Sequence, residues 1–255
     1  MSGAVITLLT DFGSDDSYVA EVKGVLLAGA PDSMLVDITH AVPQGDVLGA
    51  QYLLMRTWRR FPPGTVHLAV VDPGVGSGRR AIAVRHRGHA FVAPDNGLLT
   101  PVLDDAEIVA VSIPASAAPT FHGRDVFAPA AAALASGRHL ADLGSPVRDP
   151  VRRAPHEPRQ DKAEAVGEVV WVDRFGNLVT NIPATTVPSG SVVIGERTIS
   201  PLARTFSDVE PGMLVAYAGS GGTVEIGVRD GSATTVLGAG RGTVVKVVAT
   251  ESGDG

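Results

Sequence analysis

The chain has 255 residues, 44% of them hydrophobic, and a formal net charge of −6 at pH 7. The length and hydrophobic content predict one large or two small folded domains, and the negative charge argues against a nucleic-acid partner. Cysteine is absent, which excludes disulfides, thiolate metal sites and a cysteine nucleophile, and fits a cytoplasmic location. No apolar run approaches the ~20 residues of a membrane span. No signal peptide is expected, because the N-terminus lacks a basic segment followed by an apolar one.

Strand and helix patterns alternate through the first part of the chain. Apolar, β-branched runs predict strands at residues 5–10, 34–38, 66–71, 81–85, 90–93 and 107–113. Helical spacing predicts helices that begin near Ser14, at Asp46 and at Val126, the last of them capped by Asp125 and followed by Gly137. The alternation predicts an α/β domain over residues 1–144, with a largely parallel sheet and helices on its faces.

Two aspartates follow strands of this predicted sheet. Asp11 comes directly after the first strand, and Asp72 comes after the third, where the chain enters a loop rich in Gly, residues 73–78. Because ligands of open α/β sheets bind beyond the carboxyl ends of strands, both carboxylates are expected in one crevice. A carboxylate suits the two hydroxyl donors of a ribose, a role that we assign to Asp11. The alternatives are an Asx-turn or helix cap at Asp11 and a plain surface turn at Asp72.

The second part of the chain has a different pattern. Residues 145–164 are rich in Pro and Arg and are interpreted as an exposed linker with solvated arginines. Residues 165–255 carry short apolar runs separated by Gly or Pro, which predicts an all-β domain, a small barrel or sandwich. In the loop 173–177, Phe175 offers a flat face and Asn177 an amide that can bind an adenine edge, although both residues also suit a plain hairpin turn.

Several motifs of known chemistry are absent from the sequence. The glycines of residues 74–78 lead into a strand rather than a helix, which argues against a dinucleotide fingerprint, and neither a P-loop nor a G-x-S-x-G elbow occurs. The histidines lack zinc-ligand spacing, so no metal site is expected. What remains is a carboxylate, a guanidinium and an imidazole at Asp72, Arg79 and His122. With no Ser or Cys nucleophile beside them, these groups indicate a polarised water.

Five short motifs, in order along the chain, resemble the S-adenosyl-L-methionine (SAM) hydroxide adenosyltransferases, also called SAM hydrolases, which are relatives of the fluorinases and chlorinases. The motifs are Leu9-Thr10-Asp11-Phe12-Gly13, Val71-Asp72-Pro73-Gly74-Val75-Gly76, Pro94-Asp95-Asn96-Gly97, Phe121-His122-Gly123-Arg124-Asp125 and Asp173-Arg174-Phe175-Gly176-Asn177. The resemblance runs from Thr7 to about Val228. It implies an N-terminal α/β domain, a C-terminal β-barrel and a homotrimer, in which SAM lies between the N-terminal domain of one subunit and the C-terminal domain of its neighbour.

The same resemblance implies a reaction and a set of site residues. A water-derived hydroxide attacks the ribose C5′ of SAM and releases adenosine and L-methionine, with no cofactor, because SAM is itself the substrate. The catalytic Asp-Arg-His set of the family falls on Asp72, Arg79 and His122. Its substrate contacts fall on Asp11 for the ribose, Asp16 and Asp173 for the methionine amino group, Phe175 and Asn177 for adenine, Ser220 for the methionine carboxylate, Phe206 for an aromatic wall, and Phe121 and Gly123 of the fourth motif. The chain departs from the family at Gly219, where Asn is common, and at Gly221, where the halogenases have Arg.

Two other functions stay open on the sequence alone. A SAM-dependent halogenase is disfavoured, because halogenases carry Tyr at the position of Asp72 and Ser at that of Gly123. A carboxylate repels halide, and the missing Ser removes a hydrogen bond to it. The second alternative is a protein that binds SAM or a nucleoside without turnover.

Overall fold

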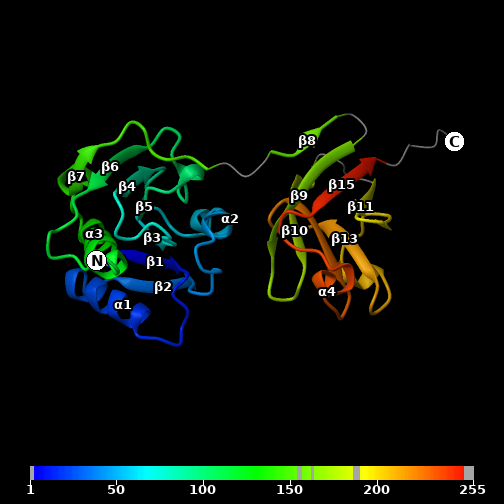
Figure 1. Ribbon diagram of the computed structural model, residues 1–255, viewed down its shortest axis with the longest axis horizontal. Coiled ribbons are helices and arrows are strands. Elements are labelled where there is room, and N and C mark those ends of the chain that lie inside the picture. The colour runs from blue at the N-terminus through cyan, green and yellow to red at the C-terminus, as the bar shows by residue number, and fades with distance from the viewer. Residues whose placement is uncertain (1–2, 154–156, 162–163, 186–189, 250–255) are drawn as a thin grey trace. The chain divides into compact units, whose positions relative to one another are not determined.

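The computed structural model describes residues 3–153, 157–161, 164–185 and 190–249. The chain forms two compact units, residues 1–154 and 155–255 (Figure 1). Each unit has its own hydrophobic core, and each is described by itself.

The N-terminal unit is built on one sheet, whose strands follow the order β2-β1-β3-β5-β4-β6-β7. The strands are β1 Val5–Thr10, β2 Met34–Thr39, β3 Val66–Val70, β4 Ala81–His86, β5 His89–Pro94, β6 Glu107–Val111 and β7 Gly144–Pro146. The α-helices of this unit are α1 Tyr18–Gly29, α2 Val47–Thr57 and α3 Ala128–Ala135. The strands predicted from sequence are therefore confirmed to within two residues at each end, while β7 was not predicted.

The sheet is mixed, which corrects the expectation of a largely parallel one. β2, β1, β3 and β5 pair in parallel, whereas β5, β4, β6 and β7 pair antiparallel. The reversal comes from the two-residue turn between β4 and β5, where Arg87 has a φ of 47° and Gly88 a φ of 79°. Two positive φ values match the right-handed twist of a hairpin, so β4 and β5 must be antiparallel.

Helices cover both faces of this sheet. On one face, α1 and α3 pack on Ile6, Leu8 and Leu68, and Figure 1 shows these two helices side by side. On the other face, α2 packs on Leu9 and Ala69. Alternate residues of each central strand thus enter opposite cores, which explains the nearly continuous apolar runs in the sequence.

The helix start at Asp46 and the role of Gly137 are confirmed, whereas Ser17, which precedes α1, makes no side-chain cap hydrogen bond. Asp46 caps α2, since its carboxylate accepts a hydrogen bond from the Gly49 N–H at 2.9 Å. Gly137 follows α3 with a φ of 89°, the left-handed conformation that suits a residue after a helix. Asp125 is not the cap of α3, because a π-helical turn, Gly123–Phe127, precedes that helix. The Asp125 carboxylate instead accepts the Ala118 N–H at 2.9 Å and binds the guanidinium of Arg124.

The first part of the expected linker contacts the N-terminal unit. β7 pairs with β6, and Arg80 Nη1 donates to Asp149 Oδ1 at 2.7 Å. The Val151 N–H donates to Asp95 Oδ1 at 2.8 Å, and Gln51 Nε2 donates to the Arg153 carbonyl at 2.7 Å. Residues up to 153 therefore belong to the packed structure of this unit.

The C-terminal unit is a nearly closed antiparallel sheet, with strand order β12-β11-β15-β9-β10-β14-β13 and β8 paired to β9. Its strands are β8 Arg159–Gln160, β9 Glu164–Val172, β10 Leu178–Pro183, β11 Gly190–Ile194, β12 Arg197–Ile199, β13 Leu214–Ala218, β14 Thr223–Val228 and β15 Val244–Ala249. The Leu202 N–H donates to the Gly190 carbonyl of β11 and the Ala203 N–H to the Ala216 carbonyl of β13, so this segment bridges the open side of the sheet. The unit is not purely β, because it also contains the short helix α4, Ala233–Leu237, which begins at Ser232.

Candidate active site

The Gly-rich loop after β3 crosses over the end of β5 and enters β4. Both ends of this loop are held by the turn that follows β5. Asn96 Nδ2 donates to the Val71 carbonyl at 2.9 Å. Arg80 Nε donates to Asp95 Oδ2 at 2.7 Å, and the Asp95 N–H donates to the Arg80 carbonyl at 2.9 Å. The loop that carries Asp72 and Arg79 is therefore fixed at the edge of the sheet where β1, β3 and β5 end.

Asp72, Arg79 and His122 are in direct contact. Arg79 Nε donates to Asp72 Oδ1 at 2.9 Å, and Arg79 Nη2 donates to Asp72 Oδ2, which makes the pair bidentate. Arg79 Nη2 also lies 2.9 Å from His122 Nδ1. The side chains of Arg79 and Asp72 are only 9% and 6% exposed, and the guanidinium lies 5.1 Å above the centre of the Phe127 ring.

The electrostatics of this set favour a neutral imidazole. Burial lowers the pKa of His122, and the positive charge of Arg79 lowers it further, against the opposing charges of Asp72 and Asp125. Because Arg79 is always a donor, His122 Nδ1 must accept from it, which leaves the imidazole proton on Nε2. Arg79 Nη1 is buried without a hydrogen-bond partner among the described residues. A buried N–H of this kind is commonly satisfied by a bound water.

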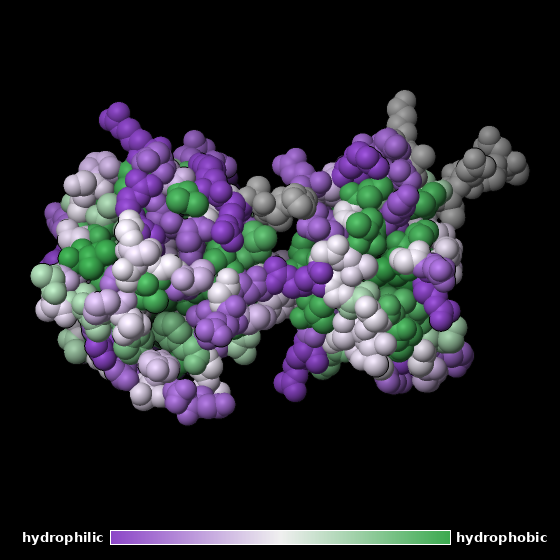
Figure 2. All heavy atoms as spheres, in the orientation of Figure 1, coloured by the Kyte–Doolittle hydropathy of each residue, from purple (hydrophilic) through white to green (hydrophobic). Residues whose placement is uncertain are grey.

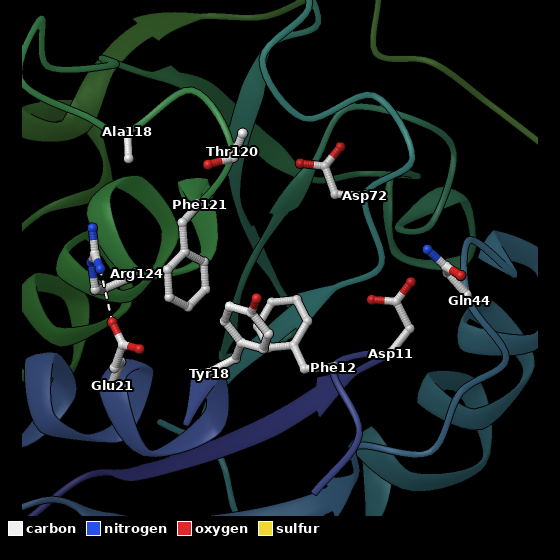
Figure 3. Close-up of a pocket in the computed structure, with 10 residues that line it drawn as sticks. All are labelled: Asp11, Phe12, Tyr18, Glu21, Gln44, Asp72, Ala118, Thr120, Phe121 and Arg124. Carbon is white, nitrogen blue, oxygen red and sulfur yellow. Dashed lines mark hydrogen bonds and ion pairs between the residues drawn. The ribbon is translucent and has the colours of Figure 1, made fainter. Parts of the chain in front are cut away.

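A pocket of about 600 Å³ opens next to these groups (Figure 3). Asp11 and Asp72 both line it, as their positions after neighbouring strands β1 and β3 predict. Asp11 Oδ2 accepts the Gly45 N–H at 2.8 Å. Burial raises the pKa of Asp11, with the nearby charge of Asp72 adding to this effect and the Gly45 N–H opposing it. Gln44 lies beside Asp11 at the same end of the pocket (Figure 3).

Three aromatic rings line the middle of the pocket. Phe12, Tyr18 and Phe121 contact one another edge to face, with ring centres 5.2 to 6.3 Å apart. Arg124 lies over the Phe121 ring at 4.9 Å and binds Glu21 at 2.8 Å, at the end of the pocket away from Asp11 (Figure 3). The rings leave no space beside the backbone of Gly123, since a Cβ there would lie 2.9 Å from Phe12 Cζ.

The candidate adenine residues lie on a second pocket, of about 670 Å³, in the C-terminal unit. Phe175, Asn177 and Phe206 all line this pocket. Asp173 organises the loop beside it, because its Oδ1 accepts the N–H groups of Phe175 and Asn177 and its Oδ2 accepts Asn177 Nδ2. Phe175 is 70% exposed, the highest value among the exposed large hydrophobic residues of the described chain.

Six candidate residues line neither pocket: Asp16, Arg79, His122, Gly123, Asp173 and Ser220. Asp16 is exposed in the segment before α1, and Ser220 is exposed in the turn between β13 and β14. The neighbouring Gly219 has a clear structural reason: a Cβ there would lie 2.1 Å from Glu225 Oε1. Glu225 is itself buried and accepts the Tyr217 hydroxyl at 3.1 Å. Among the described residues, no helix has the length and apolar character to cross a membrane.

Comparison with known proteins identifies the family. The sequence model of the SAM hydroxide adenosyltransferase N-terminal domain matches residues 6–144, and that of the C-terminal domain matches residues 167–246. This chain belongs to the SAM hydroxide adenosyltransferase family. It is 42% identical to the (R)-S-adenosyl-L-methionine hydrolase of Thermus thermophilus, over 95% of this chain and 99% of that protein.

More distant members and solved structures agree with this placement. The fluorinase of Nocardia brasiliensis is 33% identical, over 86% of this chain and 88% of the fluorinase. An uncharacterised conserved protein from Thermotoga maritima has a crystal structure that matches with a TM-score of 0.89 at 35% identity, covering 95% of this chain and 99% of that one. The crystal structure of a conserved hypothetical protein from Thermus thermophilus matches with a TM-score of 0.81 at 40% identity, covering 96% of this chain and 100% of that one.

The structure also brings to the pocket of Asp11 and Asp72 several residues that were not predicted as site residues. They are Tyr18, Glu21, Gln44, Ala118 and Thr120, together with Phe12 and Arg124, which the sequence analysis noted only within motifs. Gln44 had a usable signal, because it follows β2, the parallel neighbour of β1. Tyr18 and Glu21 had none, since their helical spacing equally fits a helix that only packs on the sheet.

Proposed function

We propose that this chain hydrolyses SAM to adenosine and L-methionine. The observation that carries the proposal is the buried contact of Asp72, Arg79 and His122 beside a pocket that Asp11 also lines. It is supported by the relatives, since those at 39% to 42% identity over 95% to 96% of this chain are named (R)-S-adenosyl-L-methionine hydrolases.

The chemistry that SAM requires fits these groups. The sulfonium is a good leaving group that departs as neutral methionine, so the difficult partner is the nucleophile, because free water has a pKa near 15.7. In the reaction, the water oxygen bonds to C5′ as the C5′–S bond breaks, and the water gives up one proton. No additional cofactor is needed for this balance.

We assign a separate role toward the attacking water to each residue of this set. Asp72 is the member of this set that lines the pocket, so we assign to it the direct contact with the water, while Arg79 holds the Asp72 carboxylate in place. Each Asp72 oxygen accepts one Arg79 donor and keeps a second lone pair, which is free to accept a water proton. His122 Nδ1 is occupied by Arg79, so we assign to His122 the role of orienting the guanidinium and the water through its Nε2 proton. Holding the water in line with the C5′–S bond supplies roughly several kcal/mol of the barrier reduction.

The remaining candidate residues are proposed as substrate contacts. The Asp11 carboxylate accepts hydrogen bonds from the two ribose hydroxyls. Phe175, Asn177 and Phe206 hold the adenine. Asp16, Asp173 and Ser220 hold the methionine end, while Phe121 and Gly123 form the wall beside the reacting carbon. Because these residues belong to two different units and SAM is small, we propose a homotrimer in which the N-terminal unit of one subunit and the C-terminal unit of its neighbour share each substrate. The exposed Phe175 and the apolar residues visible on the C-terminal unit in Figure 2 support such an assembly.

The test is a product analysis with SAM and the purified protein in water enriched in ¹⁸O. Hydrolysis predicts adenosine and methionine in equal amounts, with ¹⁸O in the 5′-hydroxyl. Asp72→Asn keeps the shape but removes the proton acceptor, so kcat should fall about 100-fold or more while KM changes little. Formation of 5′-halo-5′-deoxyadenosine faster than adenosine in excess halide would favour a halogenase. Binding of SAM without methionine release would favour a sensor.

A further inference from the structure

A series of polar contacts lies behind the loop that carries Asp11. Thr10 Oγ1 lies 2.8 Å from His40 Nδ1, and His40 Nε2 lies 3.1 Å from Asp37 Oδ1. Asp37 Oδ2 in turn accepts Lys23 Nζ at 2.6 Å. The contacts join residues of β1, β2 and α1 with a residue just after β2. Thr10 is 1% exposed and the His40 side chain 11%, so the inner end of the series is shielded from water.

Thr10 Oγ1 also binds a backbone donor. The Phe12 N–H donates to Thr10 Oγ1 at 3.3 Å, so the hydroxyl oxygen acts as the acceptor in that bond. The oxygen keeps its proton and a second lone pair, so it can donate to His40 Nδ1 in one tautomer or accept from it in the other. His40 Nε2 faces the Asp37 carboxylate at 3.1 Å without hydrogen-bond geometry. In either tautomer, Thr10 Oγ1 binds both the Phe12 N–H and His40 Nδ1.

The same two loops are also joined by their backbones. The Gly13 N–H donates to the His40 carbonyl at 2.8 Å, and the Val42 N–H donates to the Thr10 carbonyl at 3.3 Å. The Gly45 N–H binds the Asp11 carboxylate itself at 2.8 Å. The loop after β2 therefore fixes the position of Asp11, and the Thr10–His40 contact is the side-chain bond between the two loops at that point.

We propose that His40, acting through Thr10, is a positioning residue for the Asp11 carboxylate and thereby sets the affinity for the ribose of the substrate. This inference rests on the proposed function, in which Asp11 accepts the ribose hydroxyls. His40 and Thr10 do not touch the substrate. Their effect is confined to holding the Asp11 backbone, so it should appear in KM rather than in kcat and should vanish when Asp11 is removed.

The test is a double-mutant cycle of Thr10→Val with Asp11→Ala, read by KM and kcat for SAM and by calorimetric binding of SAM and adenosine. Thr10→Val preserves the shape of the side chain and removes the hydroxyl. It should raise KM and the dissociation constants about tenfold, the usual effect of one buried hydrogen bond. Asp11→Ala should raise them by more, because two bonds to a charged acceptor are lost. In the Asp11→Ala background, Thr10→Val should change KM and the dissociation constants less than twofold. His40→Ala should match Thr10→Val.

The chain supplies a matched control in the same strand. Thr7 Oγ1 lies 2.7 Å from His67 Nδ1, a second buried Thr–His pair that does not line the pocket. Thr7→Val should lower the thermal midpoint as Thr10→Val does, yet leave KM unchanged. Two results would show that the Thr10–His40 contact only stabilises the fold. In the first, Thr10→Val raises KM equally with and without Asp11. In the second, Thr7→Val raises KM as much as Thr10→Val does. A wild-type protein that binds SAM without turnover would refute only the proposed hydrolysis. The double-mutant cycle read by calorimetric binding would still test the role of His40 and Thr10. Failure to bind either ligand would refute both.

Discussion

Gly123→Ser introduces a side chain for which the structure predicts no room. A Cβ at residue 123 would lie 2.9 Å from Phe12 Cζ, 3.3 Å from Phe12 Cε2 and 3.3 Å from Phe121 Cε2. The rings cannot easily retreat, because both contact Tyr18 and Phe121 also lies against Arg124. Overpacking of this kind costs about 1–3 kcal/mol. Since His122 is the neighbouring residue, we expect the strain to displace it.

If that strain falls on the catalytic arrangement, kcat/KM for adenosine formation should fall about 5- to 150-fold, at 1.36 kcal/mol for each factor of ten. The measurement is steady-state chromatography of adenosine, together with the thermal midpoint. Phe12→Leu shortens the obstructing ring, so the double variant Phe12→Leu with Gly123→Ser should regain part of the loss. Gly24→Ser in α1 is the control, because a Cβ there meets nothing within 4 Å. Wild-type kcat/KM and thermal midpoint in Gly123→Ser would refute the steric argument, and additive losses in the double variant would show that Phe12 is not the obstacle.

Two further predictions concern assembly and acid stability. If neighbouring subunits share each substrate, some mixed interfaces of the inactive variants Asp72→Ala and Asn177→Ala will contain both intact residues. Mixing the two variants under conditions of subunit exchange should therefore restore part of the activity. Proven exchange without activity, or an active monomer in ultracentrifugation, would contradict the trimer. Burial, with a contribution from His89, lowers the pKa of His67 to about 3. The unfolded chain, with an ordinary histidine pKa near 6.5, therefore binds a proton that the folded chain does not. The free energy of unfolding should fall by about 2 kcal/mol between pH 7 and pH 5 through this residue. Urea unfolding of His67→Phe should show a flatter pH dependence, and an unchanged slope would assign the acid sensitivity elsewhere.

The parts of the molecule that sequence predicted well depend on short-range patterns. The strands β1 to β6 of the N-terminal sheet were found because each carries a short run of mostly apolar residues. The shared pocket of Asp11 and Asp72 followed from one rule about strand ends, and the rule holds because β1 and β3 are parallel neighbours. The contact of Asp72 with Arg79 joins residues within a single loop.

The parts that sequence did not predict depend on long-range packing. The direction of β4 is set by the Arg87-Gly88 turn, a weak signal beside the alternation of strands and helices. Asp125 is a residue type that often caps helices, yet its carboxylate accepts hydrogen bonds from the Ala118 N–H and the Arg124 guanidinium. Sequence analysis offered no reason for Gly219, and the structure supplies one, since the Glu225 carboxylate lies where its side chain would be.

The place of β5 in the sheet determines when the site can form as the chain folds. β5 lies between β3 and β4 but follows both in sequence, so it must insert between two strands that the chain has already supplied. Asp72 and Arg79 are only seven residues apart, yet both ends of their loop are held by Asp95 and Asn96. Non-local pairing of this kind forms slowly, because the entropy of loop closure is lost before the stabilising contacts form. A chain that stops before residue 94, whether during synthesis or as a fragment, thus has both members of the ion pair and lacks the turn that holds them at the sheet edge.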